Sequence, residues 1–446
     1  MMVLLAFITA SATRPLVLTP ERVVELALKR SLSVKAAAHK LKGAEAKIAQ
    51  AKALKMPRLT VSDTRTILRP IVTFSFPVFD PLTGQFMGLR EAEITKRYSY
   101  QTQFALSFPV YTWGRLEANI EREKRAREAV YHSLRLSKVE AVHRAREAFF
   151  ALLKAMRLKE VAEKSVQQVR AHLDVARKLF EEGLVAKYDV LRAESALAQA
   201  EEGLAKAENA VRLAKASLLA LLDLPQDTPF EARYDDGRAV EAARRLPPLG
   251  ECIKLAKEGR PDLLQLRAVL ESKRAALRAA KAGNKPTVVL ASTYTRKTAT
   301  AFAKRWDWAL VLSISWPVFD GGLTEAQVKE AREGIRQLEA ALKEAENGVE
   351  LEVRRAYLSV GEALKRLESA RKARKAAEES FRLARLRFRE GLGTTVEVLD
   401  AEWALTRARA MEAQALYDLE VSLSNLARAM GSIEIPSAAT RKGGQG

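Results

Sequence analysis

Cysteine, histidine and the common catalytic motifs are all scarce in this chain of 446 residues. The single cysteine excludes a disulfide within the chain, and the four histidines are spread between positions 39 and 172 without clustering. A zinc site needs several such ligands at short spacing, and the sequence has no phosphate-binding loop or nucleophile elbow. It therefore predicts no enzyme, no metal site and no cofactor.

Proline, glycine and aromatic residues are also few, with 15 Pro, 21 Gly and 7% Phe, Trp and Tyr. Ala, Leu, Glu, Lys and Arg dominate long stretches, which is typical of long helices rather than of a β-sandwich or a doubly wound sheet. Beyond the N-terminus, no uncharged stretch approaches the ~20 apolar residues of a membrane-spanning helix. If the protein crosses a membrane, we expect it to do so as a β-barrel.

The N-terminus carries a short apolar run, Val3–Ala12, that ends in Ala-Ser-Ala. Small residues in this pattern are typical of a signal-peptidase site, so residues 1–12 are interpreted as a secretory leader. No Lys or Arg precedes the run, which indicates a leader whose start is truncated or misassigned. A packed or disordered N-terminal strand is the alternative.

The formal net charge is +20, from 75 basic and 55 acidic residues. Such an excess of basic residues is compatible with binding to nucleic acid or anionic lipid, or with a solvated surface. The basic residues are mixed with Glu throughout the helical stretches, and no block of Lys and Arg or aromatic RNA-recognition sequence occurs. We therefore expect no nucleic-acid partner.

The chain is an internal duplication. Ser107–Val110 recurs as Ser315–Val318 at a displacement of 208 residues, and the match continues without a gap as far as Leu222. The front of each half matches at a displacement of 229, with Pro57 paired to Pro286. The difference of 21 residues places a longer insertion in the first half, between Pro57 and Ser107.

Each half has the same predicted order of elements: an amphipathic helix, two strands and a long helical hairpin. The first repeat covers 13–222 and the second 250–431, with a Pro- and Asp-rich connector at 223–249 and a flexible tail at 432–446. The first helix is expected at about 19–55, and again at about 250–282. Strands are expected at about 58–67 and 98–108, then at 287–296 and 307–316, and helical hairpins at 115–222 and 323–430.

The second strand of each half alternates large apolar residues with small or polar ones, which identifies strands. An aromatic residue stands at each end of this apolar face. These residues are Tyr100 and Phe108 in the first half, and Trp308 and Trp316 in the second. Eight residues of strand span roughly 26 Å, which matches the apolar band between the aromatic girdles of membrane barrels. A soluble hairpin packed on a helix is the alternative.

Four strands cannot close a membrane barrel, because small barrels need about eight and an open edge leaves backbone groups unpaired in lipid. The chain is therefore expected to oligomerise, two copies giving eight strands and three giving twelve. Prolines are predicted to mark the junctions between helices and strands, since each removes a backbone donor and fixes φ. These are Pro57, Pro109, Pro286 and Pro317.

Two matched segments, 183–193 and 391–401, resemble the hairpin tips of the TolC family of outer-membrane efflux proteins. The resemblance extends over nearly the whole chain after the leader. It implies a mainly α protein with a small membrane β-barrel part: a homotrimer whose twelve-stranded barrel is continued by a periplasmic α-helical barrel. It also implies an outer-membrane location with most of the mass in the periplasm, contact with outer-membrane lipid, and docking to a periplasmic adaptor and an inner-membrane transporter.

In the family, carboxylates narrow the tunnel at the tips, and by motif position these would be Glu397 and Asp400, with Asp189 as a neighbour. A spacing of three places the first two on one helix face. The alternative is a capping box at 394–397 and a solvated aspartate. Members can lock the closed tip through a tyrosine and an arginine, but Phe388 and Gly393 stand at those positions.

The tip turns themselves are expected at Gly183, Gly391 and Gly393, since helices commonly end in a left-handed residue that glycine tolerates. Together these features predict a passive export duct, of an efflux or type I secretion system, gated at its periplasmic tip. A soluble periplasmic helical scaffold or tether is the alternative. It explains the long helices but leaves the aromatic-bounded strands and the leader unexplained.

Overall fold

The computed structural model describes residues 16–299 and 304–434, so the expected leader and the last residues of the tail lie outside the described ranges. The chain divides into two compact units. The strand unit comprises Lys42–Ala129 and Leu266–Ala341, and the helical unit comprises the remaining segments. Within the described ranges, no helix combines the length and apolar character needed to cross a membrane.

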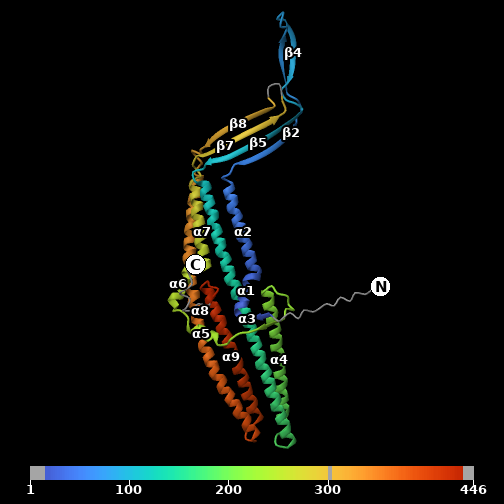
Figure 1. The fold of residues 1–446 in the computed structure, drawn as a ribbon, viewed down its shortest axis with the longest axis vertical. Coiled ribbons are helices and arrows are strands. Elements are labelled where there is room, and N and C mark those ends of the chain that lie inside the picture. The colour runs from blue at the N-terminus through green and yellow to red at the C-terminus, as the bar shows by residue number, and fades with distance from the viewer. Residues whose placement is uncertain (1–15, 300–303, 435–446) are drawn as a thin grey trace, which may run out of the picture. The chain divides into compact units, whose positions relative to one another are not determined.

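The strand unit contains a four-stranded antiparallel sheet in the order β2-β5-β7-β8 (Figure 1). The four strands predicted from the alternation are present as β2 (Arg58–Ile67), β5 (Tyr98–Tyr111), β7 (Thr287–Lys297) and β8 (Trp306–Ser315). The two halves of the duplication meet at the centre of the sheet, where β5 pairs with β7. Among the described strands, the edges β2 and β8 are therefore each left with one unpaired side.

The predicted junction at Pro109 is wrong, because β5 continues past this proline to Tyr111. The register with β7 shifts between Pro109 and Tyr111, so the proline lies at a β-bulge. A bulge tolerates proline since its missing N–H is not needed by the ladder. Pro57 and Pro286 directly precede β2 and β7, and Pro317 lies between β8 and the next helix.

One sheet face is apolar and uncovered in the protomer. Trp308 and Trp316 are both 61% exposed, and Tyr100 is 41% exposed. Trp316 lies one residue beyond β8, where its indole N–H donates to the carbonyl of Asn284 at 3.2 Å. Phe108 is half-buried. So much exposed apolar surface on a folded protomer marks an interaction or membrane surface.

The predicted insertion of the first half forms a separate hairpin of β3 (Thr73–Phe79) and β4 (Phe86–Glu93). It lies between β2 and β5 in the chain and extends beyond the end of the four-stranded sheet (Figure 1). The matching link of the second half, between β7 and β8, includes residues 300–303, which lie outside the described ranges.

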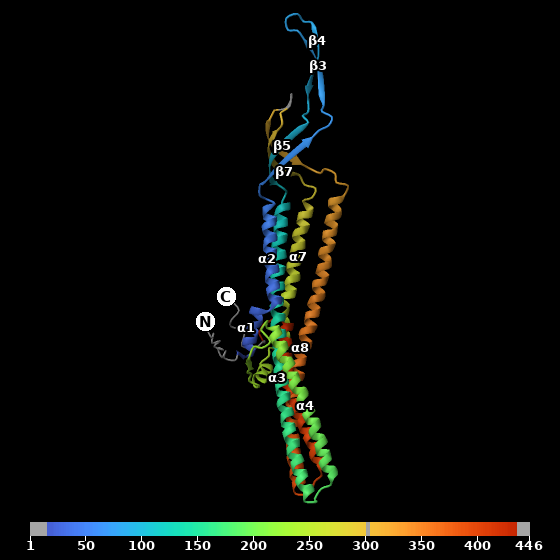
Figure 2. The ribbon, with the colours of Figure 1, turned by 90° about the vertical axis from the view of Figure 1, so that its right-hand side faces the viewer.

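The two long helical hairpins are α3 (Arg115–Glu181) with α4 (Lys187–Leu221), and α8 (Leu323–Arg389) with α9 (Thr395–Ala429). α3 and α8 each have 67 residues, a length on the order of 100 Å. In the helical unit the turns of both hairpins lie at the same end (Figure 2). The core of this unit gathers buried side chains from both hairpins, among them Phe149, Leu218, Leu367 and Leu419.

Each predicted first helix is in fact two helices. α1 (Pro20–Arg30) and α2 (Leu32–Ala53) are separated by Ser31, and α6 (Leu249–Gly259) and α7 (Pro261–Lys281) by Arg260. In the second half Pro261 explains the break, because proline disfavours helical backbone in the residue before it. Nothing in the sequence around Ser31 marks the first break. Thr19 caps α1, its hydroxyl accepting from the Arg22 N–H at 3.3 Å.

The connector is more ordered than its turn-rich sequence indicates. It contains a short strand, β6 (Phe230–Ala232), and a short helix, α5 (Arg238–Arg244). β6 pairs in parallel with β1 (Leu16–Leu18) at the start of the described chain. Strands of three residues carry no readable alternation, so the sequence did not reveal them.

Candidate functional site at the hairpin tips

Both hairpins end in the same glycine turn. Gly183 and Gly391 have φ values of +75° and +69°, in the left-handed region. The next residue closes each helix end: Leu184 N–H donates to the Leu179 carbonyl at 2.8 Å, and Leu392 N–H to the Arg387 carbonyl at 2.8 Å. This is the six-to-one bond of a Schellman motif. The repeated Gly-Leu pair therefore builds two equivalent turns.

Gly393 has a different role in the second turn. A Cβ built at this position would lie 3.1 Å from the backbone nitrogen of Phe388 and 3.2 Å from a carboxylate oxygen of Glu397. The turn is folded too tightly there for a side chain to enter without displacement of its neighbours. A longer side chain at this position would therefore require a different turn.

Replacing Gly391 by alanine should destabilise the protein by about 1–2 kcal/mol, because the new Cβ must adopt a left-handed conformation. Gly203 lies in the interior of α4, and a Cβ added there would meet no atom within 4 Å. Its replacement by alanine should stabilise the protein by roughly 0.5–1 kcal/mol. Chemical unfolding of the two variants, followed by helical circular dichroism, measures both effects. Changes of the same sign would contradict the assigned turn.

Of the three predicted tip carboxylates, Asp189 and Glu397 lie in the first turns of α4 and α9, and Asp400 lies in the next turn of α9. Glu397 and Asp400 are exposed on α9, and neither forms an ion pair within the part of the chain that the structure describes. The Glu397 N–H donates to the Thr394 hydroxyl at 3.3 Å, so Thr394 caps the helix. Asp189 is half-buried and accepts from the Ala186 N–H at 3.3 Å, so it caps α4.

Beneath these carboxylates the two tips pack through apolar side chains. Phe388 on α8 is buried and contacts the His172 ring of α3, with 4.8 Å between ring centroids. Burial lowers the pKa of His172 to about 4, so the imidazole is neutral at neutral pH. Val398 and Leu405 of α9 complete this cluster. The His172–Phe388 contact therefore joins α3 and α8 near the tips.

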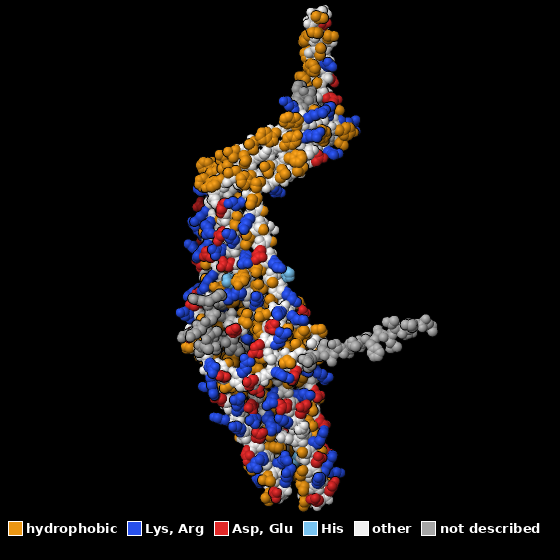
Figure 3. Space-filling view, viewed as in Figure 1, with side chains coloured by type: hydrophobic (Ala, Val, Ile, Leu, Met, Phe, Trp, Pro, Cys, Tyr) orange, Lys and Arg blue, Asp and Glu red, His pale blue; other side chains and the backbone are white. Residues whose placement is uncertain are grey.

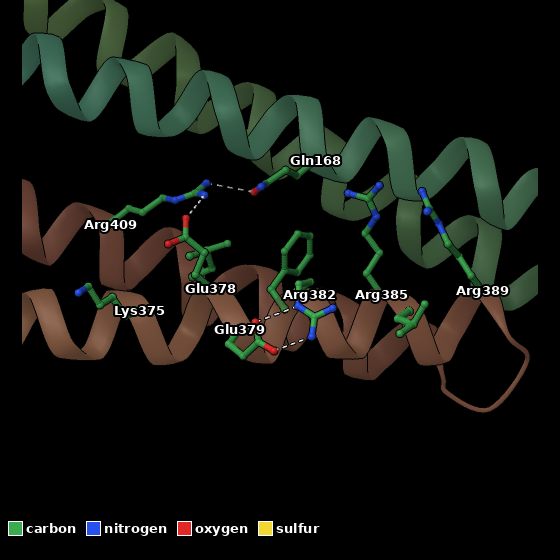
Figure 4. Close-up of a pocket in the computed structure, with 11 residues that line it drawn as sticks. Gln168, Lys375, Glu378, Glu379, Arg382, Arg385, Arg389 and Arg409 are labelled. Carbon is green, nitrogen blue, oxygen red and sulfur yellow. Dashed lines mark hydrogen bonds and ion pairs between the residues drawn. The ribbon is translucent and has the colours of Figure 1, made fainter.

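A cavity of about 550 Å³ lies next to this cluster, between α3, α8 and α9 (Figure 4). Arg409 bridges it, donating to Glu378 at 3.0 Å and to Gln168 at 3.5 Å. Arg385 and Arg389 also line the cavity, and neither has an ion-pair partner among the described residues. The cavity wall is therefore predominantly basic.

This basic wall did not emerge from the sequence analysis, although a signal existed. Lys375, Arg382 and Arg389 follow one another at intervals of seven residues along α8. That spacing places them on one stripe of a helix. All three line the cavity in the structure.

The sequence matches the model of the outer membrane efflux protein family over residues 23–223 and 252–432. The two matched ranges coincide with the two halves of the duplication. Together they cover most of the chain.

Several characterised proteins are similar in sequence. The fusaric acid resistance protein FusA of Burkholderia cepacia is 26% identical over 52% of this chain and 44% of its own length. The outer membrane protein TolC of Escherichia coli K12 is 26% identical over 64% of this chain and 60% of its own length. Nodulation protein T of Rhizobium leguminosarum bv. trifolii is 21% identical over 92% and 84%. The match thus spans less than two thirds of FusA and of TolC.

Solved structures share the fold over almost the whole chain. CusC superposes with a TM-score of 0.78 at 18% identity, covering 93% of this chain and 92% of that one. VceC of Vibrio cholerae superposes with a TM-score of 0.71 at 18% identity, covering 93% and 97%. CusC is described as forming a transmembrane channel, and VceC as an outer membrane protein.

Proposed function

Because the chain belongs to the outer membrane efflux protein family, we propose that it is one protomer of an outer-membrane efflux or secretion channel of the TolC type. The observation that carries the proposal is the combination of an open, apolar-faced sheet with two 67-residue helices on one chain. The apolar face of the sheet could contact lipid, and helices of that length could enclose a water-filled passage across the periplasm.

Three copies complete the channel. TolC-family channels are trimeric, and three four-stranded sheets supply twelve strands when β2 of one copy pairs with β8 of the next. Such pairing satisfies the backbone groups that both edges leave open, each of which would cost several kcal/mol in lipid. In such a trimer neither edge of the four-stranded sheet would remain open.

The tips would receive a periplasmic adaptor and an inner-membrane transporter. Leu184 and Leu392 support this part of the proposal, since they follow the two turn glycines and are 67% and 72% exposed. Two exposed leucines at the same end of the helical unit would offer apolar contacts to a partner protein. Transport would be passive, with the tip opening when a partner binds its open state more tightly than its closed state.

A soluble periplasmic scaffold is disfavoured by the sheet. Leu310, Leu312 and Ile314 on β8 are each more than half exposed, on the same face as Trp308. A soluble tether would have to cover this face with another layer. None of the described helices does so in the protomer.

The oligomer mass tests the proposal. Protein extracted from outer membranes with detergent should have the mass of three chains, and it should aggregate when the detergent is removed. A monomer that stays dispersed without detergent would contradict the proposal and favour the scaffold.

A further inference from the structure

The basic cavity between α3, α8 and α9 has no part in the proposed function (Figure 4). Among the described residues that line it, cations outnumber carboxylates. The cations are Lys375, Arg382, Arg385, Arg389 and Arg409, and the carboxylates are Glu378 and Glu379. On the face of the helices drawn in Figure 3, by contrast, Lys and Arg side chains are interspersed with Asp and Glu. The cavity therefore combines a concave shape with an excess of positive charge.

Both carboxylates of the cavity wall are already paired. Glu379 accepts from Arg382 at 2.6 Å and 2.9 Å, and Glu378 accepts from Arg409 at 3.0 Å. The other cations of the wall have no ion-pair partner within residues 16–299 and 304–434. Their positive charges are therefore left uncompensated.

Two of these unpaired cations, Arg385 and Arg389, are four residues apart on α8. Side chains at this spacing are neighbours on a helix surface, and like charges there repel each other. Both side chains extend from α8 toward α3 (Figure 4). Guanidinium groups bind the oxygens of acid groups through two parallel hydrogen bonds. An acid group between the two arginines would relieve the repulsion and engage donors that no described residue uses.

Arg385 lacks an ion pair that its counterpart in the first half makes. In the first hairpin, Arg177 of α3 pairs with Glu194 of α4 at 2.7 Å. The displacement of 208 residues maps this pair onto Arg385 and Glu402. Glu402 is only 2% exposed, and it accepts instead from the Ser165 hydroxyl of α3 at 2.7 Å. The carboxylate that would neutralise Arg385 is thus held in the core.

The neighbouring ion pair is kept in both hairpins. Arg170 pairs with Glu201 at 2.7 Å in the first hairpin. The equivalent positions of the second hairpin hold Glu378 and Arg409, which pair at 3.0 Å with the charges exchanged. The second hairpin therefore retains a cross-helix ion pair beside the cavity, and Arg385 is the exception next to it.

The basic stripe of the wall is also specific to the second hairpin. The equivalent positions of α3 are neutral or acidic. They hold Gln167, Asp174 and Glu181 in place of Lys375, Arg382 and Arg389. A helix of the same length in an equivalent hairpin thus folds without these cations, so helix packing alone does not account for them.

Apolar side chains lie beside the cations. Phe381 and Leu405 line the cavity and are buried, and Leu386, which also lines it, is 49% exposed. The volume of about 550 Å³ lies in the range of sites for small organic molecules. The wall therefore offers donors for an acid group and apolar contacts for the body that carries it.

We propose that this cavity binds an amphipathic organic anion. Its acid group lies between Arg385 and Arg389, and its apolar part lies against Leu386 and Phe381. All the lining residues belong to one chain, so the site does not depend on the proposed trimer. The inference adds a ligand-binding site to a channel that is otherwise proposed to be passive.

Titration calorimetry with naphthalenesulfonate, an aromatic anion, tests the site. The full-length protein is kept in detergent, and the heat of titration into detergent alone is subtracted. Arg385→Gln combined with Arg389→Gln should weaken binding by about tenfold or more, because both charge-assisted contacts to the acid group are removed. The matched control, Arg170→Gln with Arg177→Gln, removes the same charge from ion pairs of the first hairpin. It should bind the probe as the original protein does.

Each outcome either supports the site or overturns it. Absence of binding by the original protein, equal binding by the variant of Arg385 and Arg389, or an equal loss in the control would overturn it. Equally tight binding of uncharged naphthol, which lacks the acid group, or of inorganic phosphate, which lacks the apolar part, would also overturn it. The oligomer mass is determined in the same samples. A trimer that binds no probe removes only the site, whereas a monomer that binds the probe removes only the proposed channel.

Discussion

Replacing both Glu397 and Asp400 by alanine should lower the preference of the single channel for cations over anions by about tenfold. The two carboxylates are three residues apart, so they share one face of α9, and both are exposed. Three copies would bring six carboxylates to the mouth of one tunnel, as acidic rings do in other cation-selective pores. We propose that these residues form the constriction.

The reversal potential in a salt gradient measures this preference for the purified channel in a planar bilayer. The matched control replaces Glu182 and Glu390, which directly precede the turn glycines. This replacement removes the same number of charges from the same tips. It should change the preference much less. An unchanged reversal potential in the first variant, or an equal change in the control, would show that Glu397 is only part of a helix cap.

The second large effect is expected at Glu420, inside the core of the helical unit. This α9 side chain is 3% exposed, and its Oε1 atom has no hydrogen-bond partner in the described structure. Burial raises the pKa of Glu420 to about 7, and the charge of Arg146 on α3 only partly opposes that rise. The folded protein thus keeps this carboxyl protonated in a range where an unfolded chain releases the proton.

Because the folded pKa is raised, Glu420 makes stability fall as the pH rises from about 4.5 to about 7, after which its contribution is constant. Glu420→Gln removes this dependence. The difference in unfolding free energy, variant minus original protein, should therefore increase by about 3 kcal/mol as the pH rises from about 4.5 to about 7.

Denaturant unfolding at pH 4.5 and pH 7.5 measures this difference, and Glu412→Gln on the same helix is the control. Glu412 forms ion pairs with Arg371 and Arg374 of α8, so its replacement controls for the loss of a carboxylate from α9. A difference between Glu420→Gln and the original that stays constant with pH would contradict the buried, protonated state.

Much of the fold could be predicted because two strong signals coincide. The strict alternation around Trp308 and its repeat around Tyr100 identify strands, and the ungapped match from Ser107 to Leu222, at a displacement of 208 residues, transfers the helical hairpin from one half to the other. The break at Arg260 was missed although Pro261 marks it in the sequence. The break at Ser31 and the strand β6 were missed because such short segments carry too little periodicity to read.

The site was predicted less completely. The turns at Gly183 and Gly391 could be predicted, because glycine is the residue that best tolerates the left-handed backbone found there. Burial on a long helix depends instead on which neighbours cover each face. The isolation of Glu420 and the contact between Phe388 and His172 therefore became visible only with the packed hairpins.

The most direct test of the central claim is the conductance of the protein, purified from outer membranes, in planar lipid bilayers, with the oligomer mass determined in the same detergent. The trimeric duct predicts discrete single-channel steps from a sample with the mass of three chains. A sample that forms no channels and has the mass of one or two chains would contradict the duct and favour a soluble helical scaffold.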